Sequence, residues 1–321
     1  MQKNLSSLFK FLFLLSKKKR ITAYYLQILL YMNTTFFKPF FLFNATLLVS
    51  FCACSPKSNI ESSSIPQQNI TQNEGVSDAE NEISSPPLLP AETDIWDVSD
   101  VDISEIAPDK KLISFTFDDS PSRSLENILS VFASFNEENP DCKASATLFC
   151  NGYLFDAQNA HLLTAACALG FELGNHTQSH KDLTTLDEEK LRREIDQTDI
   201  LLSKIDGKPR HLLRAPFGKA NDEVKACSPV PLIDWTIDTI DWTGVSEDAI
   251  YRAVFDNRFS GAIVLMHDGY QHTVDALKRL LPDLKADGYQ VVSVSKMAKA
   301  HGCNLQKGKH YIRARKQNSS S

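Results

Sequence analysis

Residues 112–121 read LISFTFDDSP, and this stretch decides the fold. The first six residues form a short, mostly apolar run, which is typical of a strand buried on both faces. Two adjacent carboxylates, Asp118 and Asp119, follow directly. Burying carboxylates beside an apolar strand is costly unless a metal ion or hydrogen bonds hold them. The stretch therefore predicts a central strand whose carboxyl end carries chemically useful groups.

Outward from this strand, short apolar runs alternate with amphipathic stretches over residues 110–300. Such alternation indicates an α/β fold with a parallel sheet or a β/α barrel. No internal repeat and no glycine-rich phosphate loop is present in the sequence. The other strands are expected at 144–150, 171–174, 212–214, 232–235, 262–267 and 290–294, and the helices at 122–135 with Ser122 as N-cap, 157–169, 187–205, 247–255, and 273–281 with Pro282 as its stop.

Polar side chains recur at the predicted strand ends, where parallel α/β folds place their active sites. His176 and His180 are four residues apart, so one helical turn would put both on one face, as metal ligation requires. Each group alone is weak evidence, because an Asp-Asp pair is commonly a turn and a lone histidine commonly packs in a core. Their joint occurrence at strand ends is far more specific. The groups are Asp118 and Asp119, His176 and His180, Arg214, Asp238, Asp241 with Trp242, and His267 with Asp268.

The first 54 residues carry seven basic residues and no acidic ones, which predicts a targeting signal. A tighter signal starts at Met32, and either Met1 or Met32 can be the true start. Its apolar stretch, 39–53, has signal-peptide length and is short for a membrane span. FCACS at 51–55 is similar to a bacterial lipobox, so we expect lipidation at Cys54 and attachment to the outer face of the membrane. Secretion without lipid and a retained anchor helix are the alternatives.

Residues 55–108 contain eleven acidic residues and one basic residue among many Ser, Asn, Gln and Pro. This composition predicts a disordered spacer ahead of a folded domain at 109–300. Residues 301–321 are expected to be a solvated basic tail, with contact to an anionic wall polymer or membrane surface as the alternative.

The charge balance and the cysteines exclude one class of partner and one kind of metal site. Beyond residue 54, 27 basic residues face 40 acidic ones, which argues against nucleic acid as a partner. Five of the seven cysteines lie in the body of the chain without a CxxC pair, so a cysteine zinc site is not expected. The sequence leaves the disulfide pairing and the oligomeric state open.

The strand-end groups read, in chain order, TFDDSP at 116–121, HTQSH at 176–180, RAPF at 214–217, DW at 241–242 and LMH at 265–267. In these five motifs the chain resembles the NodB-like polysaccharide deacetylases, carbohydrate esterase family four. The resemblance covers roughly residues 110–300 and implies a distorted (β/α) barrel. Ser120 stands where the family has glycine, so the turn either needs no positive φ or tolerates strain. Phe217 stands where tyrosine is common.

The resemblance implies roles for the first three motifs. It makes Asp118 the catalytic base and assigns Asp119, His176 and His180 as ligands of a divalent metal. Zinc is the expected ion, with cobalt or another divalent ion as alternatives. Arg214 is the implied partner that orients the base.

For the remaining motifs, the resemblance implies that the backbone N–H of Phe217 stabilises the oxyanion. His267 is the implied general acid and Asp241 polarises it. Trp242 is expected to line the groove and Leu265 to form a wall of the acetyl pocket. The other histidines, expected to be surface or structural residues, are His161, His211, His272, His301 and His310.

The implied activity is metal-dependent hydrolysis of N-acetyl groups from a GlcNAc-containing polysaccharide such as peptidoglycan or a chitin-like polymer. An O-deacetylase of acetylated xylan is the alternative within the same fold. A non-catalytic carbohydrate-binding lipoprotein is the alternative from another class, and it predicts loss of at least one metal or acid–base residue. All of these residues are present in the chain.

Overall fold

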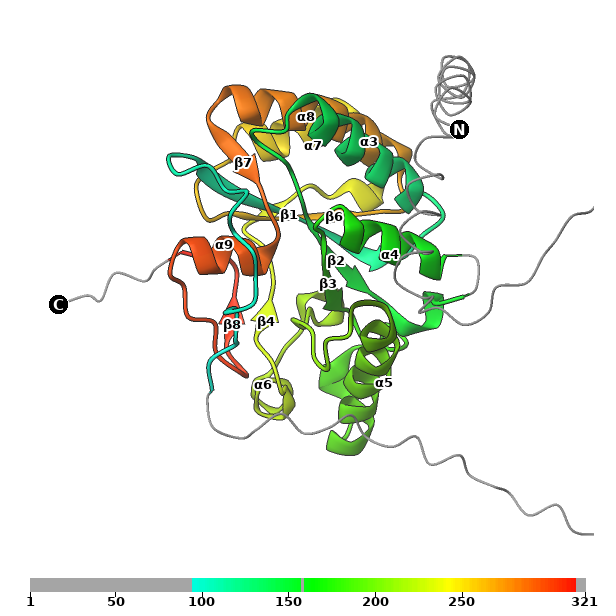
Figure 1. The fold of residues 1–321 in the computed structure, drawn as a ribbon. Coiled ribbons are helices and arrows are strands. Elements are labelled where there is room, and N and C mark those ends of the chain that lie inside the picture. The colour runs from blue at the N-terminus through cyan, green and yellow to red at the C-terminus, as the bar shows by residue number, and fades with distance from the viewer. Residues whose placement is uncertain (1–93, 157–158, 316–321) are drawn as a thin grey trace, which may run out of the picture. The chain divides into compact units, whose positions relative to one another are not determined.

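The computed structural model describes residues 94–156 and 159–315, and its centre is strand β1, Lys111–Ser120 (Figure 1). This strand matches the apolar run expected from the sequence, and all but its first residue and Asp119 are buried. Parallel strands flank it on both sides: β2, Thr147–Cys150, and β6, Ile263–His267. A strand covered on both faces must be apolar along its length, which explains the continuous LISFTF pattern.

The main sheet has the strand order β3-β2-β1-β6-β5, with β7 paired to the start of β1. Every pairing between these strands is parallel. Strand β4 pairs with β8 in a second, two-stranded sheet, and single bridges through Leu213 link β4 to the end of β3. The remaining strands are β3 at Glu172–Asn175, β4 at Leu232–Ile233, β5 at Ile237–Asp238, β7 at Tyr289–Val291 and β8 at His310–Tyr311.

The expected α/β fold with a parallel sheet is confirmed, whereas a closed barrel is not. Among the described residues, the pairings form an open path that ends at β5. Strands β4, β5 and β8 have two residues each, which is too short to carry a continuous hydrogen-bond ladder around the sheet. The segment 212–214, expected to be a strand, contributes only the isolated bridges of Leu213.

Helices α3, α7 and α8 group on one side of the sheet, and α5 and α6 lie at the opposite end of the view (Figure 1). Helix α5 follows its sequence closely: Asp187 caps its first turn by accepting from the Lys190 N–H, and Gly207 ends it at φ 77°. The helices are α3 at Leu125–Glu138, α4 at Ala160–Ala168, α5 at Glu188–Asp206, α6 at Asp222–Cys227, α7 at Glu247–Phe255, α8 at Gln271–Ala286 and α9 at Val294–Ala300, with short 3₁₀ turns η1 at Gly152–Leu154, η2 at Leu183–Thr185, η3 at Pro216–Gly218 and η4 at Asp241–Thr243.

Two helix limits differ from the sequence expectation. Pro282 lies inside α8 rather than ending it. An internal proline costs about 3 kcal/mol, but Leu281 and Leu284 are almost fully buried and each contributes about 2 kcal/mol by burial. The second difference is the start of α3, which lies at Leu125, so Ser122 does not cap this helix. The Ser122 hydroxyl instead donates to the Asp268 carbonyl oxygen.

The folded unit extends beyond the expected limits of 109 and 300. At the amino side, Ile95 bridges Gln306 in antiparallel fashion and the Trp96 N–H donates to the Leu305 carbonyl. At the carboxyl side, Leu305 and Ala314 are buried, so this part of the expected solvated tail packs against the domain. The targeting segment, Cys54 and the spacer up to residue 93 lie outside the described residues.

Two further observations concern the described part of the chain. Its five cysteines are free thiols, and two of them, Cys142 and Cys150, are buried. None of its helices has the length and apolar character needed to cross a membrane.

Candidate active site

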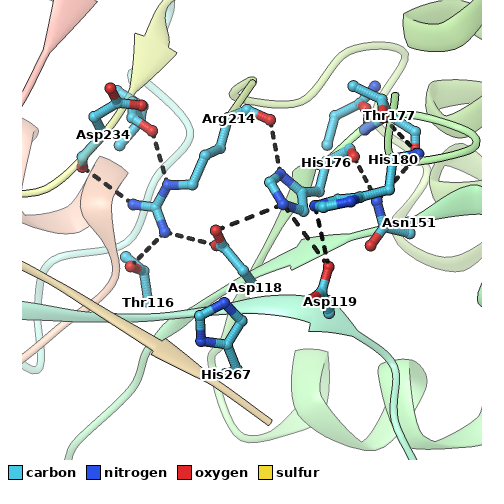
Figure 2. A network of polar contacts seen from close by, with 12 residues as sticks. Thr116, Asp118, Asp119, Asn151, His176, Thr177, His180, Arg214, Asp234 and His267 are labelled. Carbon is cyan, nitrogen blue, oxygen red and sulfur yellow. Dashed lines mark hydrogen bonds and ion pairs between the residues drawn. The ribbon is translucent and has the colours of Figure 1, made fainter. Parts of the chain in front are cut away.

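The two carboxylates at the end of β1 have different surroundings (Figure 2). Asp118 is buried, whereas the Asp119 side chain is 43% exposed, because the backbone turns to φ 59° at Asp119. Asp118 Oδ1 accepts a hydrogen bond of 2.7 Å from Arg214 Nη1. The burial of a carboxylate is tolerated here because a charged partner meets it.

Arg214 is itself fully buried and every arm of its guanidinium has a partner. Nε donates to the Ile233 carbonyl, Nη2 to the Asp234 carbonyl, and Nη1 to Thr116 Oγ1 as well as to Asp118. The guanidinium also stacks 4.1 Å from the Phe149 ring centroid. Arg214 is thereby fixed in one orientation and in turn fixes the carboxylate.

The Arg214 contact also sets the charge of Asp118. Burial alone would raise the pKa of Asp118, but the adjacent Arg214 and His176 outweigh it and hold the pKa below its usual value. Asp118 is therefore a carboxylate at neutral pH, as a general base must be.

The HTQSH segment brings His176 and His180 together, although not through the expected helical turn. Thr177 and His180 have positive φ values of 72° and 52°, so the segment is an irregular loop. The His180 Nε2 atom lies 3.6 Å from Asp119 Oδ1, and His176 Nε2 lies 3.9 Å from the same oxygen. The three ligand atoms all lie within 4.8 Å of one another. Two ligands in a tetrahedral zinc site are about 3.4 Å apart, so small adjustments suffice.

Three further observations show that this trio fits a divalent cation. His176 Nδ1 is 2.8 Å from the Arg214 carbonyl oxygen, which requires a proton on Nδ1 and leaves the Nε2 lone pair directed at the site. Asp119 Oδ1, the oxygen that both histidines face, is buried and has no hydrogen-bond partner. Burial together with the neighbouring His176 lowers the pKa of His180, which favours the neutral form that binds metal.

His267 ends strand β6 and is held by Asp241. Its Nδ1 atom is 2.7 Å from Asp241 Oδ1, and its backbone N–H donates to Asp241 Oδ2. Thr273 also donates to Asp241 Oδ2, at 2.7 Å. Burial would lower the pKa of His267, but the bond to Asp241 and the charge of Asp118 raise it above its usual value. These contacts favour the cationic form of His267, in which Nε2 can donate a proton.

The other expected contact residues surround this group. Phe217 is 61% exposed at φ 62°, and its ring packs edge-on against His180 with centroids 4.7 Å apart. Trp242 is 57% exposed on η4, next to Asp241. Leu265 is buried in β6, where it pairs with Thr116 of β1. Two large exposed apolar side chains therefore lie beside the polar centre.

Several supporting residues gave no signal in the sequence. Thr116 was visible as part of the first motif but had no role, and Thr273 had no distinguishing neighbours. Asp234 accepts a hydrogen bond from Arg214 through its backbone carbonyl, and a pattern of side chains cannot reveal such a contact. His272, expected to be surface or structural, places Nε2 2.8 Å from the Asp241 carbonyl oxygen. His211 is structural, as expected, and is buried between Asp199 and Asp206.

The geometry can perform hydrolysis of an acyl bond. Figure 2 shows Asp118 between His267 and the pair formed by His176 and His180. A carboxylate able to act as a base, three side chains able to hold a cation and an imidazole able to act as an acid lie close together. Such a group can activate water, polarise a carbonyl and protonate a leaving group.

Comparison with known proteins agrees with this chemistry. Residues 105–228 match the family model described as polysaccharide deacetylase. A peptidoglycan-N-acetylglucosamine deacetylase of Bacillus cereus is 33% identical over 202 residues, which cover 60% of this chain and 91% of that protein. The peptidoglycan-N-acetylmuramic acid deacetylase PdaC of Bacillus subtilis is 31% identical, and this chain spans 40% of its length.

Solved structures and a more distant relative extend the comparison. A structure of PdaC from Bacillus subtilis superposes with a TM-score of 0.56 at 30% identity, over 61% of this chain and 93% of the other. A bifunctional xylanase/xylan deacetylase of Cellvibrio japonicus is 27% identical over 55% of this chain and 26% of its own length. By its motifs, its site geometry and these similarities, the chain belongs to the polysaccharide deacetylase family.

Proposed function

We propose that this protein removes N-acetyl groups from GlcNAc-containing cell-wall polysaccharide. Peptidoglycan is the leading substrate, and a chitin-like polymer is the other polysaccharide of this class. The observation that carries the proposal is the pair formed by His267 and the buried Asp241, beside the Asp118 carboxylate. An amide nitrogen is a poor leaving group until it is protonated, so an N-deacetylase needs a cationic acid in addition to a base. The names of the relatives from Bacillus support the same substrate class.

The mechanism follows from the positions of the side chains. Asp118, kept ionised by Arg214, accepts a proton from the water that attacks the acetyl carbonyl carbon. His267 gives its Nε2 proton to the sugar nitrogen as the C–N bond breaks. The products are acetate and a free amine on the sugar. The backbone N–H of Phe217 is our candidate donor to the carbonyl oxygen as negative charge develops there.

Asp119, His176 and His180 would hold the divalent cation. When bound, such an ion polarises the carbonyl oxygen as a Lewis acid and lowers the pKa of water. The two imidazoles and one carboxylate form a donor set suited to zinc. Cobalt can bind the same kinds of ligand. We therefore propose zinc as the ion.

We also propose that the enzyme works outside the cytoplasm, at the outer face of a bacterial membrane. The basic and apolar first 54 residues and the lipobox-like FCACS support an anchor at Cys54. The acidic spacer that follows would let the domain reach into the wall.

Acetylated xylan is the second candidate substrate. The bifunctional xylanase/xylan deacetylase of Cellvibrio japonicus supports it, at 27% identity over 180 residues. An ester leaves as an alcohol, so it depends less on the acid His267 than an amide does. A His267→Ala variant that loses amide hydrolysis and keeps much ester hydrolysis would separate the two reactions.

The test is acetate release by the purified protein loaded with Zn²⁺. Peptidoglycan, chitin oligomers and acetylated xylan are compared, beside an Asp118→Asn variant. We expect release from peptidoglycan, a loss of roughly 10²–10⁴-fold in the variant, and abolition by a chelator. Release from xylan alone would favour the ester substrate. A metal-loaded protein that binds glycan but releases no acetate would instead be a carbohydrate-binding protein.

A further inference from the structure

Asp268 follows His267 at the end of β6 and has no role in the reaction described above. Its side chain is completely buried. One carboxylate oxygen, Oδ2, accepts hydrogen bonds of 2.9 Å from both Ser120 Oγ and the Ser122 backbone N–H. The other oxygen, Oδ1, is buried without a partner. A carboxylate placed this way costs stability, which indicates that its position serves another purpose.

The same short turn bonds back to the backbone of Asp268. Ser122 Oγ donates to the Asp268 carbonyl oxygen at 3.0 Å and accepts from the Ser124 N–H at 3.0 Å. Three hydrogen bonds therefore join residue 268 to the turn of residues 120–122, which we call the Ser120 turn. They connect the end of β6 to the end of β1, where the ladder between these strands stops at Asp118 and His267.

The Ser120 turn adjoins Asp119 directly in the chain. Asp119 lies between Asp118, fixed by Arg214, and Ser120, fixed by Asp268. Its φ of 59° is left-handed, and such a conformation persists only when the neighbouring residues enforce it. The enforced turn aims Oδ1 of Asp119 at the Nε2 atoms of His176 and His180.

We propose that Asp268 is a positioning residue that aims Asp119 at the cation site by holding the Ser120 turn to the end of β6. Ser120 is an active part of this arrangement, because its hydroxyl is one of the two donors to the carboxylate. The inference rests on the proposed function only in that it assumes a cation at Asp119, His176 and His180.

Substitutions at Asp268 separate this role from simple packing. Asp268→Ala removes the acceptor of both bonds, and we expect it to weaken Zn²⁺ binding by roughly 10–100-fold, as loss of a group that orients a ligand does. Asp268→Asn keeps an oxygen for the Ser120 and Ser122 donors and should bind Zn²⁺ within a few-fold of the unchanged protein. Asp256→Ala, at an exposed aspartate, is the matched control.

The experiment measures Zn²⁺ affinity by competition with a chromogenic chelator, and the visible absorption spectrum of the Co²⁺-loaded proteins, whose bands report ligand geometry. Neither readout needs activity, so an inactive protein that binds Zn²⁺ as expected would contradict the proposed function and leave this inference intact. Ser120→Ala removes one hydroxyl donor to Asp268, and it replaces Asp268→Ala in both measurements if that variant does not fold. We expect it to weaken Zn²⁺ binding several-fold and to alter the Co²⁺ spectrum.

Two results would overturn the inference. One is unchanged Zn²⁺ affinity and Co²⁺ spectrum in both Asp268→Ala and Ser120→Ala. The other is an equal loss in Asp268→Asn and Asp268→Ala, because the charge rather than the hydrogen bonds would then matter.

Discussion

Asp118 and His267 are directly paired residues in the parallel ladder between β1 and β6. Paired residues on neighbouring strands are about 5 Å apart along the hydrogen-bonding direction. The candidate base and acid therefore start from one rigid piece of backbone, and their separation does not depend on a loop. The candidate cation ligands from the HTQSH loop lie to one side, and Arg214 and Asp241, from elsewhere in the sequence, hold Asp118 and His267 by hydrogen bonds.

Removal of a cation ligand should abolish both metal binding and activity. A His180→Ala variant keeps the fold, because the His180 side chain is 27% exposed, but leaves two ligands. We expect Zn²⁺ affinity to fall by more than 100-fold and acetate release to fall to background. Equilibrium dialysis with Zn²⁺ and the acetate assay check this. Full activity in the presence of a strong chelator would contradict a metal requirement.

The charge of His267 should set the alkaline limit of activity. Against the effect of burial, the bond to Asp241 raises the pKa of His267, so the protonated acid persists to higher pH, and we expect activity to be lost as pH rises through that pKa. Asp241→Asn removes the charge and lowers the pKa, so the alkaline limb of the kcat profile should move to lower pH. The profile of the Asp241→Asn variant from pH 5 to 10 is the measurement, and an unmoved alkaline limb would show that another group titrates.

Arg214 should set the acid limit of activity, because it controls the pKa of Asp118. Without its guanidinium, the effect of burial on Asp118 loses its largest opposing charge, and the pKa of that carboxyl rises. In an Arg214→Met variant, we expect the acid limb of kcat to move to higher pH. Stability should fall by about 3–5 kcal/mol, because a buried carboxylate loses its partner. Thr116→Val, which removes a lesser contact of Arg214, is the milder companion variant.

His211 should make stability depend on pH far from the active site. Its bonds to Asp199 and Asp206 outweigh burial and raise its pKa from 6.5 to about 9. Because the folded pKa is raised, the stabilisation is complete below about pH 6.5 and is lost as pH rises toward 9. The shift corresponds to at most about 3 kcal/mol.

Urea unfolding of the unchanged protein and of His211→Gln tests this at pH 6 and pH 9. The variant should be less stable by about 3 kcal/mol at pH 6 and by much less at pH 9. Equal differences at the two pH values would mean that His211 contributes by packing and not by charge.

The sequence predicted those parts of the molecule in which local pattern and tertiary role agree. The apolar run before Asp118 is a buried strand, and the amphipathic segment from Asp187 to Gly207 is a capped helix. The expected metal ligands and the acid–base residues also come together, because each follows the carboxyl end of a strand or an adjacent loop. Their individual roles remain predictions for the experiments above.

Tertiary contacts explain what the sequence could not show. Pro282 is tolerated in α8 because the leucines around it are buried, and that burial depends on distant parts of the chain. The two-residue strands β5 and β8 are too short for any periodic signal. The partners of Asp268, more than 140 residues away, share no spacing rule with it.

The contact of Trp96 with Leu305 ties the start of the described chain to the segment that follows α9. The antiparallel bridge from Ile95 to Gln306 and the bond from the Lys307 N–H to the Asp94 carbonyl close this point. A force applied through a tether on the amino-terminal side would therefore load these contacts before it reaches the β1–β6 ladder that carries Asp118 and His267.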